Sequence, residues 1–253
     1  MHEFLQQIIV EGGNIAKDFF LKGVSFKSKA HLGDLVTEAD VAVNTFLINK
    51  IKERFPLHRI VSEEAPPEGT EGAEYEWIID PIDGTRNFAF GIGMWCTMVA
   101  LYERAEPYAA AIYNPLANEL FFAKVGEGAT LNGLPIHVNQ VASLDHGFGI
   151  CVRGVNTVHE SRYRRFLDHL TNETTVWMHN FGTMLSSCYV ASGGADFYVG
   201  NCGFDHDYAA IATIAPEAGA LVTNCDGAPW KRGRRDIVIT NPELHSKLLD
   251  LLK

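Results

Sequence analysis

The chain has 253 residues, of which 47% are hydrophobic, and this composition is sufficient to bury the core of one large domain or of two closely associated ones. Its formal net charge of -10 argues against a protein that binds nucleic acid or an anionic membrane through bulk electrostatics, although it is compatible with metal binding. The five cysteines include no C-x-x-C pair and the ten histidines no H-E-x-x-H or H-x-H, which argues against a disulfide framework, a zinc ribbon and a zinc hydrolase.

The first part of the chain predicts two helices. Apolar residues recur at helical spacing over residues 4–20, although the pair Gly12-Gly13 is expected to weaken the middle of this helix. Thr37 and Asp40 are spaced as in a capping box, immediately before an amphipathic stretch. The second helix is therefore expected to begin there.

The rest of the chain predicts strands first and an alternation of strands and helices afterwards. The strand candidates of the first half are residues 58–62, 76–80, 95–102, 107–114 and 119–125. In the second half, strands are predicted at residues 148–154, 174–180, 196–199, 220–223 and 236–240, and helices at residues 159–170, 183–194, 243–252 and in a stretch to residue 220 that begins near Asp207. This order predicts a layered α/β fold in one compact unit, with an N-terminal α+β subdomain at 1–145 and a C-terminal α/β subdomain at 146–253.

Acidic residues stand where the predicted elements begin or end. These residues are Asp34, Asp40, Glu63, Glu64, Asp80, Asp83 and Asp207. Taken singly, each one would be a helix cap or a surface charge. However, Glu63 follows one apolar run and Asp80 ends another, so both are expected at the ends of neighbouring buried strands, where ligands of open α/β sheets collect.

The stretch WIIDPIDGTRNF at residues 77–88 concentrates this pattern. Pro-Ile-Asp-Gly alone is a good turn, but a turn does not explain Asp80. If Asp80 and Asp83 both point inward, their repulsion must be offset by protonation or by a hard cation, for which Mg²⁺ is the usual intracellular candidate. Gly84-Thr85 would then open a helix whose free N–H groups favour a phosphate. Together these features indicate phosphoryl chemistry.

WIIDPIDGTRNF resembles the D-P-I-D-G-T signature of the inositol monophosphatase family of Mg²⁺-dependent phosphatases. GDLVTEAD and VSEE resemble the upstream motifs of that family, and DYAAIATIAPEAGA resembles its downstream aspartate, small-residue helix and E-A-G ending. The resemblance extends over nearly the whole chain in the right order, which is more specific than any one motif. It implies an αβαβα sandwich, related to fructose-1,6-bisphosphatase, that forms a homodimer.

The resemblance also implies roles for residues. The implied metal ligands, for two or three Mg²⁺ ions, are Glu63, Asp80, the backbone carbonyl of Ile82, Asp83 and Asp207. The implied catalytic residues are Glu63 together with Thr85 and Asp40, of which the last two would orient and deprotonate the attacking water. The implied phosphate and substrate contacts are Gly84, Thr85, Arg86 and Asp207. Asp207 has the family spacing to Glu217, whereas Asp205 is out of register.

Four positions depart from the family pattern. His206 replaces a tryptophan, and Pro216 is expected to interrupt the helix before Glu217. Arg86 replaces a second threonine, and Gly200 stands where a glutamate contacts the inositol hydroxyls. Arg86 and the run GIGMWCTMVAL resemble the histidinol-phosphate phosphatase branch, and nucleotide-bisphosphate phosphatases also carry a basic residue at the position of Arg86.

The function expected from these observations is a Mg²⁺-dependent, lithium-sensitive phosphomonoesterase that acts on a small polyol or amino-alcohol phosphate. Histidinol phosphate and a nucleotide or sugar bisphosphate are alternative substrates, and a regulatory protein that contacts the transcription machinery is an alternative of another class. A pure binding module would have no need to keep like charges together, which favours the enzyme. The chain shows no apolar run of the roughly 20 residues of a membrane span and no signal peptide, so a cytoplasmic location is expected.

Overall fold

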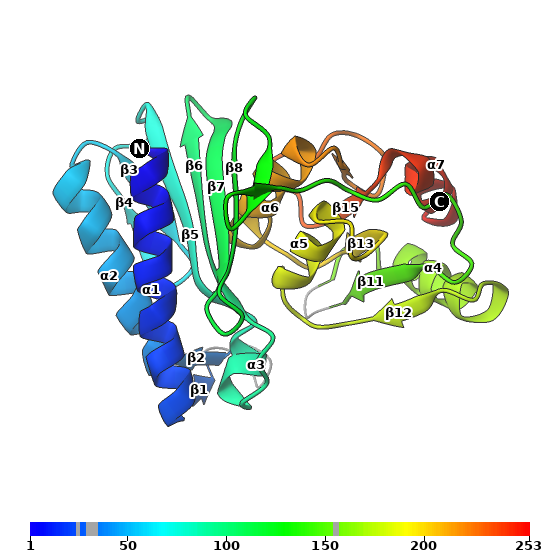
Figure 1. Cartoon of the computed structure of the whole chain (residues 1–253), viewed down its shortest axis with the longest axis horizontal. Helices are drawn as coiled ribbons and strands as arrows, with labels where there is room; N and C mark the ends of the chain where they lie inside the picture. The colour runs from blue at the N-terminus through cyan, green and yellow to red at the C-terminus, as the bar shows by residue number, and fades with distance from the viewer. Residues whose placement is uncertain (24–25, 29–34, 154–156) are drawn as a thin grey trace.

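The computed structural model describes residues 1–23, 26–28, 35–153 and 157–253. Within these ranges the chain alternates layers of helices with layers of β-sheet (Figure 1). The helices are α1 (His2–Lys22), α2 (Glu38–Arg54), α3 (Thr85–Ala89), α4 (Glu160–Glu173), α5 (Leu185–Ala191), α6 (Asp205–Glu217) and α7 (Pro242–Leu251). The strands are β1 (Phe26–Ser28), β2 (Leu35–Thr37), β3 (Arg59–Ser62), β4 (Ala65–Glu68), β5 (Tyr75–Asp83), β6 (Cys96–Glu103), β7 (Glu106–Asn114), β8 (Glu119–Lys124), β9 (Ala129–Leu131), β10 (Leu134–Pro135), β11 (Phe148–Val152), β12 (Trp177–His179), β13 (Phe197–Gly200), β14 (Leu221–Thr223) and β15 (Ile237–Thr240).

Two sheets form the β layers. The larger one has eight strands in the order β10-β9-β8-β7-β6-β5-β3-β4, and the smaller one has five in the order β12-β11-β13-β15-β14. Helices α1 and α2 cover one face of the larger sheet, α5 and α6 lie between the sheets, and α4 and α7 cover the far face of the smaller sheet (Figure 1). This arrangement confirms the predicted αβαβα fold.

Strand β5 lies within the larger sheet and is buried on both faces. Trp77 and Ile79 belong to the core formed with α1 and α2, whereas Ile78 belongs to the core that contains α6. Because successive side chains of a strand point to opposite faces, Asp80 is directed to the α6 side. Strand β3 is parallel to β5 and pairs Ser62 with Ile79, so Glu63 and Asp80 stand at the same end of two neighbouring strands, as predicted.

The glycine pair in the first helix does not weaken it as expected. Helix α1 is continuous from His2 to Lys22. A Cβ atom on Gly12 would lie 3.2 Å from Leu47, and one on Gly13 would lie 2.5 Å from a ring carbon of Tyr113. The two glycines therefore allow α1 to pack closely on α2 and β7, and this packing compensates for their low helix propensity.

The helix that carries Asp207 differs from the prediction at its C-terminal end. Helix α6 begins at Asp205, near Asp207 as predicted, but it ends at Glu217 rather than near residue 220, and the expected interruption at Pro216 is wrong because Pro216 lies inside the helix. Glu217 accepts hydrogen bonds from the backbone N–H groups of Gly126 (2.9 Å) and Gly128 (2.8 Å), which tie the end of α6 to the turn after β8.

The predicted division of the chain at residue 145 stays a prediction, since α6 packs against β5, β6 and β7 of the larger sheet. Both sheets thus share one core through this helix. In the part of the chain that the structure describes, no helix has both the length and the apolar character that a membrane span requires.

Candidate metal and phosphate site

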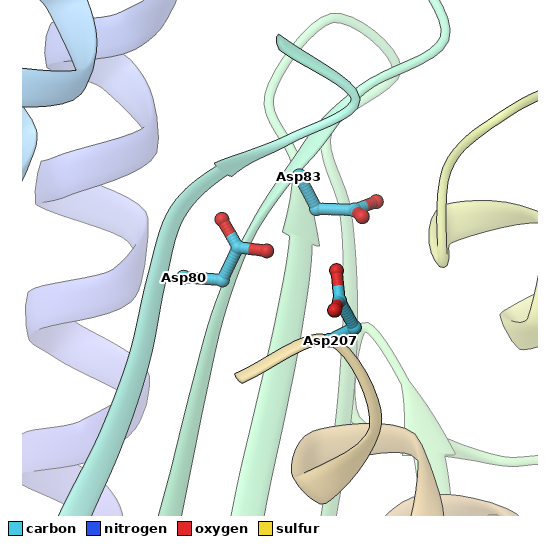
Figure 2. A group of neighbouring side chains, drawn as sticks. All are labelled: Asp80, Asp83 and Asp207. Carbon is cyan, nitrogen blue, oxygen red and sulfur yellow. The ribbon is translucent and has the colours of Figure 1, made fainter. Parts of the chain in front are cut away.

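Three of the predicted metal ligands meet where β5 ends and α6 begins. One carboxylate oxygen from each of Asp80, Asp83 and Asp207 lies within 4.8 Å of the other two. Figure 2 shows Asp80 and Asp83 at the end of β5 and Asp207 in the first turn of α6, with their carboxylates gathered in one place. Asp80 is 2% exposed and Asp83 is 7% exposed, so two of the three carboxylates are removed from water.

Three carboxylates stand close together in this cluster, and Nε2 of His206 lies 3.6 Å from Oδ2 of Asp207. Burial raises the pKa of Asp80 well above its ordinary value, and the charges of Glu63, Asp83 and Asp207 raise it further. Burial also raises the pKa of Asp83 to about 7, although a hydrogen bond from Thr183 opposes this increase. Ionised carboxylates at this separation repel one another strongly in a buried site, so they require a proton or a cation between them.

A hard divalent cation fits the donor atoms that the site presents. Oδ1 of Asp80 is buried and has no hydrogen-bond partner within the described residues. A buried carboxylate oxygen without a partner is unfavourable unless another group occupies its lone pairs. The cluster consists of anionic oxygens alone, the ligand type that Mg²⁺ prefers.

Glu63 lies in the turn after β3 and outside this group of three. Its backbone N–H donates to the carbonyl of Ile79 at 3.1 Å, which holds the turn against β5. Among the neighbouring charges, that of Glu63 has the largest effect on the pKa of Asp80. Glu63 thus stands close enough to influence the cluster electrostatically, and its role as a metal ligand stays a prediction.

The predicted phosphate-binding turn has the expected backbone form. Gly84 is left-handed, with a φ of 87°, and it caps the short helix α3 that begins at Thr85. A Cβ atom at Gly84 would lie 3.0 Å from the carbonyl oxygen of Met94, so a side chain would be hindered as well as strained. The Thr85 hydroxyl donates to the carbonyl of Ile82 at 2.9 Å, and that carbonyl is the predicted backbone metal ligand.

Asp40 caps helix α2 with one carboxylate oxygen and leaves the other without a partner among the described residues. Its Oδ2 accepts hydrogen bonds from the N–H (2.8 Å) and the hydroxyl (2.6 Å) of Thr37, which confirms the predicted capping box of α2. Its Oδ1 is buried without a partner among the described residues, and burial raises the pKa of Asp40 to about 7. No hydrogen bond joins Asp40 to Thr85 within the described ranges, so their joint action on a water molecule stays a prediction.

The structure separates Asp205 from Asp207. Asp205 accepts hydrogen bonds from Nε of Arg232 at 3.1 Å and from the N–H of Gly233 at 2.6 Å, and it is not part of the cluster. The carboxylate of Asp207 accepts from the N–H of Phe204 at 2.5 Å. Asp34, which the sequence also places at an element boundary, lies outside the described residues.

Thr183 is a site residue that the sequence analysis missed. Its hydroxyl donates to Oδ2 of Asp83, and the next backbone N–H, that of Met184, donates to the same oxygen at 2.6 Å. These bonds leave Oδ1 of Asp83 for other partners. The available signal was a second Gly-Thr pair, Gly182-Thr183. It stands shortly before a helix of small residues, much as Gly84-Thr85 stands at the start of α3.

Comparisons with known proteins agree with this geometry. The inositol monophosphatase family matches residues 1–253 of the chain. An inositol-1-monophosphatase of Synechocystis sp. is 32% identical over 253 residues, which are 99% of this chain and 88% of that protein. A putative Nus factor SuhB of Neisseria meningitidis serogroup B is 32% identical over 250 residues, which are 98% of this chain and 92% of that protein. The crystal structure of the extragenic suppressor protein SuhB from Bartonella henselae superimposes with a TM-score of 0.92 at 26% identity, over 99% of this chain and 97% of that one.

Proposed function

Because the chain belongs to the inositol monophosphatase family, a family of phosphatases, we propose that it hydrolyses the phosphate monoester of a small polyol or amino alcohol with the help of Mg²⁺. The observation that carries this proposal is the cluster of Asp80, Asp83 and Asp207, of which the first two are buried, beside the left-handed turn at Gly84. Acidic oxygens for a cation next to backbone N–H groups for an anion are what the hydrolysis of a dianionic ester needs.

The residues divide into three roles. Asp80, Asp83 and Asp207 would hold two or three Mg²⁺ ions, together with Glu63 and the carbonyl of Ile82. When bound, Mg²⁺ offsets the charge of the phosphate and makes a neighbouring water more acidic. Inhibition by Li⁺ is expected on the family resemblance.

The second and third roles concern the phosphate and the proton. The N–H groups of Gly84 and Thr85 would bind phosphate oxygens, while the Thr85 hydroxyl and Asp40 would orient the attacking water. The free Oδ1 of Asp40 and its pKa of about 7 suit a group that accepts a proton near neutral pH. Water attacks phosphorus directly in this scheme, without a covalent intermediate on the protein.

The surroundings of Gly200 argue against a preference for inositol 1-phosphate. A Cβ atom on Gly200 would lie 2.9 Å from the hydroxyl of Tyr208 and 3.1 Å from a ring carbon of Tyr198, and both tyrosines are buried. A glutamate therefore does not fit there unless these rings move. The chain consequently lacks the carboxylate that the family resemblance places against the inositol hydroxyls.

Arg86 is the residue for which we expect an effect on substrate choice. It is exposed in the first turn of α3, and its guanidinium makes no ion pair or hydrogen bond with any residue in the described ranges. A guanidinium beside the phosphate-binding turn could pair with a second anionic or polar group of the substrate. The Arg86→Thr variant is therefore expected to lose about 10- to 150-fold in kcat/KM for the preferred substrate and less for inositol 1-phosphate.

A panel of phosphomonoesters assayed with Mg²⁺ tests both the function and the role of Arg86. The panel comprises inositol 1-phosphate, histidinol phosphate, fructose 1,6-bisphosphate and an adenosine bisphosphate. An equal loss across the panel in Arg86→Thr would give this arginine a structural role, and a wild-type preference for inositol 1-phosphate would contradict the interpretation of Gly200. No turnover of any member would favour the alternative of a regulatory protein, which the names of the SuhB relatives support.

The cellular location and the oligomeric state of the enzyme are proposed on more general grounds. None of the five cysteines, which all lie in the described ranges, forms a disulfide, as is usual in the reducing cytoplasm, which we take as its location. A homodimer is proposed from the family resemblance alone. Neither proposal affects the chemistry of the site.

A further inference from the structure

A chain of ion pairs crosses from the larger sheet to the start of α6. Nε of Arg232, in the loop before β15, donates to Oδ2 of Asp205 at 3.1 Å, and its Nη1 donates to Oε1 of Glu76. The other oxygen of Glu76 lies 2.8 Å from Nε of Arg59 on β3. Arg232 therefore joins a residue of β5 to a residue of α6.

The surroundings of Arg232 hold it in place. Its side chain is 29% exposed, and the carboxylates of Glu76 and Asp205 are 16% and 28% exposed. The guanidinium lies over the ring of Tyr102, with 5.4 Å from Cζ to the ring centroid. A planar guanidinium fixed by two carboxylates and an aromatic ring is more rigid than an exposed ion pair. It can therefore hold the two elements that it joins at a fixed separation.

The two elements that Arg232 joins are the two that build the metal cluster. Strand β5 carries Glu76 and, on the same face four residues later, Asp80. Helix α6 carries Asp205 and, within the same first turn, Asp207. The separation of Asp80 and Asp207 thus depends on how the start of α6 rests against β5.

We propose that Arg232 is a positioning residue for the metal site, because it fixes the start of α6 on β5 and thereby the distance between Asp207 and Asp80. The inference rests on the proposed function in that the cluster must bind Mg²⁺. It assigns no contact between Arg232 and the metal or the substrate.

The sign of the effect distinguishes positioning from simple electrostatics. Removing a positive charge near an acidic cluster should, by Coulomb's law alone, strengthen the binding of a divalent cation. Loss of a bridge that positions a ligand should instead weaken it, since residues that orient metal ligands commonly contribute about tenfold or more to affinity. The two explanations therefore predict opposite changes in the dissociation constant of Mg²⁺.

The test is calorimetric titration of the intact protein with Mg²⁺ in the absence of substrate. Arg232→Met is expected to raise the dissociation constant of Mg²⁺ by about tenfold. Arg232→Lys keeps the charge but loses the planar guanidinium that reaches both carboxylates, and it is expected to raise the constant by less. Asp205→Asn breaks the bridge at its α6 end and is expected to weaken binding similarly, and the double variant should be no weaker than the single ones. Lys231→Met removes an exposed charge from the same loop and is the matched control, with an unchanged or slightly tighter constant.

Unchanged or tighter binding in Arg232→Met would overturn the inference. Weaker binding in Asp205→Asn does not rescue it, because the loss of an acid near the cluster weakens cation binding by Coulomb's law alone. If the wild-type protein bound no Mg²⁺ at all, the proposed function would fail and this inference with it, so the two failures are distinguishable. The kinetic counterpart is a raised Mg²⁺ requirement in Arg232→Met with kcat largely recovered at saturating Mg²⁺. A kcat that stays low at saturating Mg²⁺, with an unchanged dissociation constant, would also contradict positioning.

Discussion

Asp80→Asn is expected to lower kcat/KM for phosphate release by about 10³-fold, because it removes a buried anionic ligand from a site whose cation contributes several kcal/mol to the stabilisation of the transition state. The same substitution is expected to stabilise the metal-free protein at pH 8. The pKa of Asp80 is raised in the folded state, so ionisation costs folding free energy as the pH rises from the ordinary value of 3.8 towards the raised value, and asparagine avoids this cost. Thermal melting with and without Mg²⁺ measures this effect.

The opposite signs of the two effects make this prediction specific. Mg²⁺ should raise the melting temperature of the wild-type protein and should have little effect on Asp80→Asn. Asp205→Asn alters an acid in the same region that is outside the cluster, and it should retain a clear, although weaker, response to Mg²⁺. A variant Asp80→Asn that melts and turns over like the wild type would show that the cluster does not hold the catalytic metal.

Thr85→Ala is expected to lower kcat by on the order of 10²-fold, with a small change in KM, as for the loss of a group that orients the attacking water. The Thr85 hydroxyl is held by the carbonyl of Ile82 at 2.9 Å, so its direction is already defined in the metal-free protein. Steady-state kinetics on the preferred substrate measures the effect.

Thr85→Ser is the matched control, since it keeps the hydroxyl and should retain most of the rate. Thr183→Ala offers a second comparison, because that hydroxyl also lies in the site but donates to Asp83 rather than facing the predicted water. Turnover of Thr85→Ala at the wild-type rate would remove Thr85 and Asp40 as the pair that activates the water.

The core strands and the acidic cluster were predictable because their signals are local. Apolar runs that lead into acids, such as those before Glu63 and Asp80, identify strand ends without knowledge of the rest of the chain. The spacing to Glu217 that the family resemblance implies selected Asp207, the aspartate of α6 that lies in the cluster, whereas Asp205 is bonded to Arg232. The layered fold followed from the family resemblance more than from periodicity.

The features that were not predicted depend on contacts between distant segments. Gly13 of the continuous helix α1 packs closely on Tyr113 of β7, and the bond from Thr183 to Asp83 joins residues 100 positions apart. The bridge of Arg232 spans 156 positions to Glu76. No local pattern reports such pairings, because they depend on the tertiary arrangement and not on the propensity of either segment.

The most direct test of the central claim is phosphate release by the wild-type protein from the best substrate of the panel, measured in excess chelator and again after Mg²⁺ is restored. The clustered carboxylates of Asp80, Asp83 and Asp207 predict that activity is abolished by the chelator and returns with Mg²⁺. Full activity in excess chelator would contradict the account.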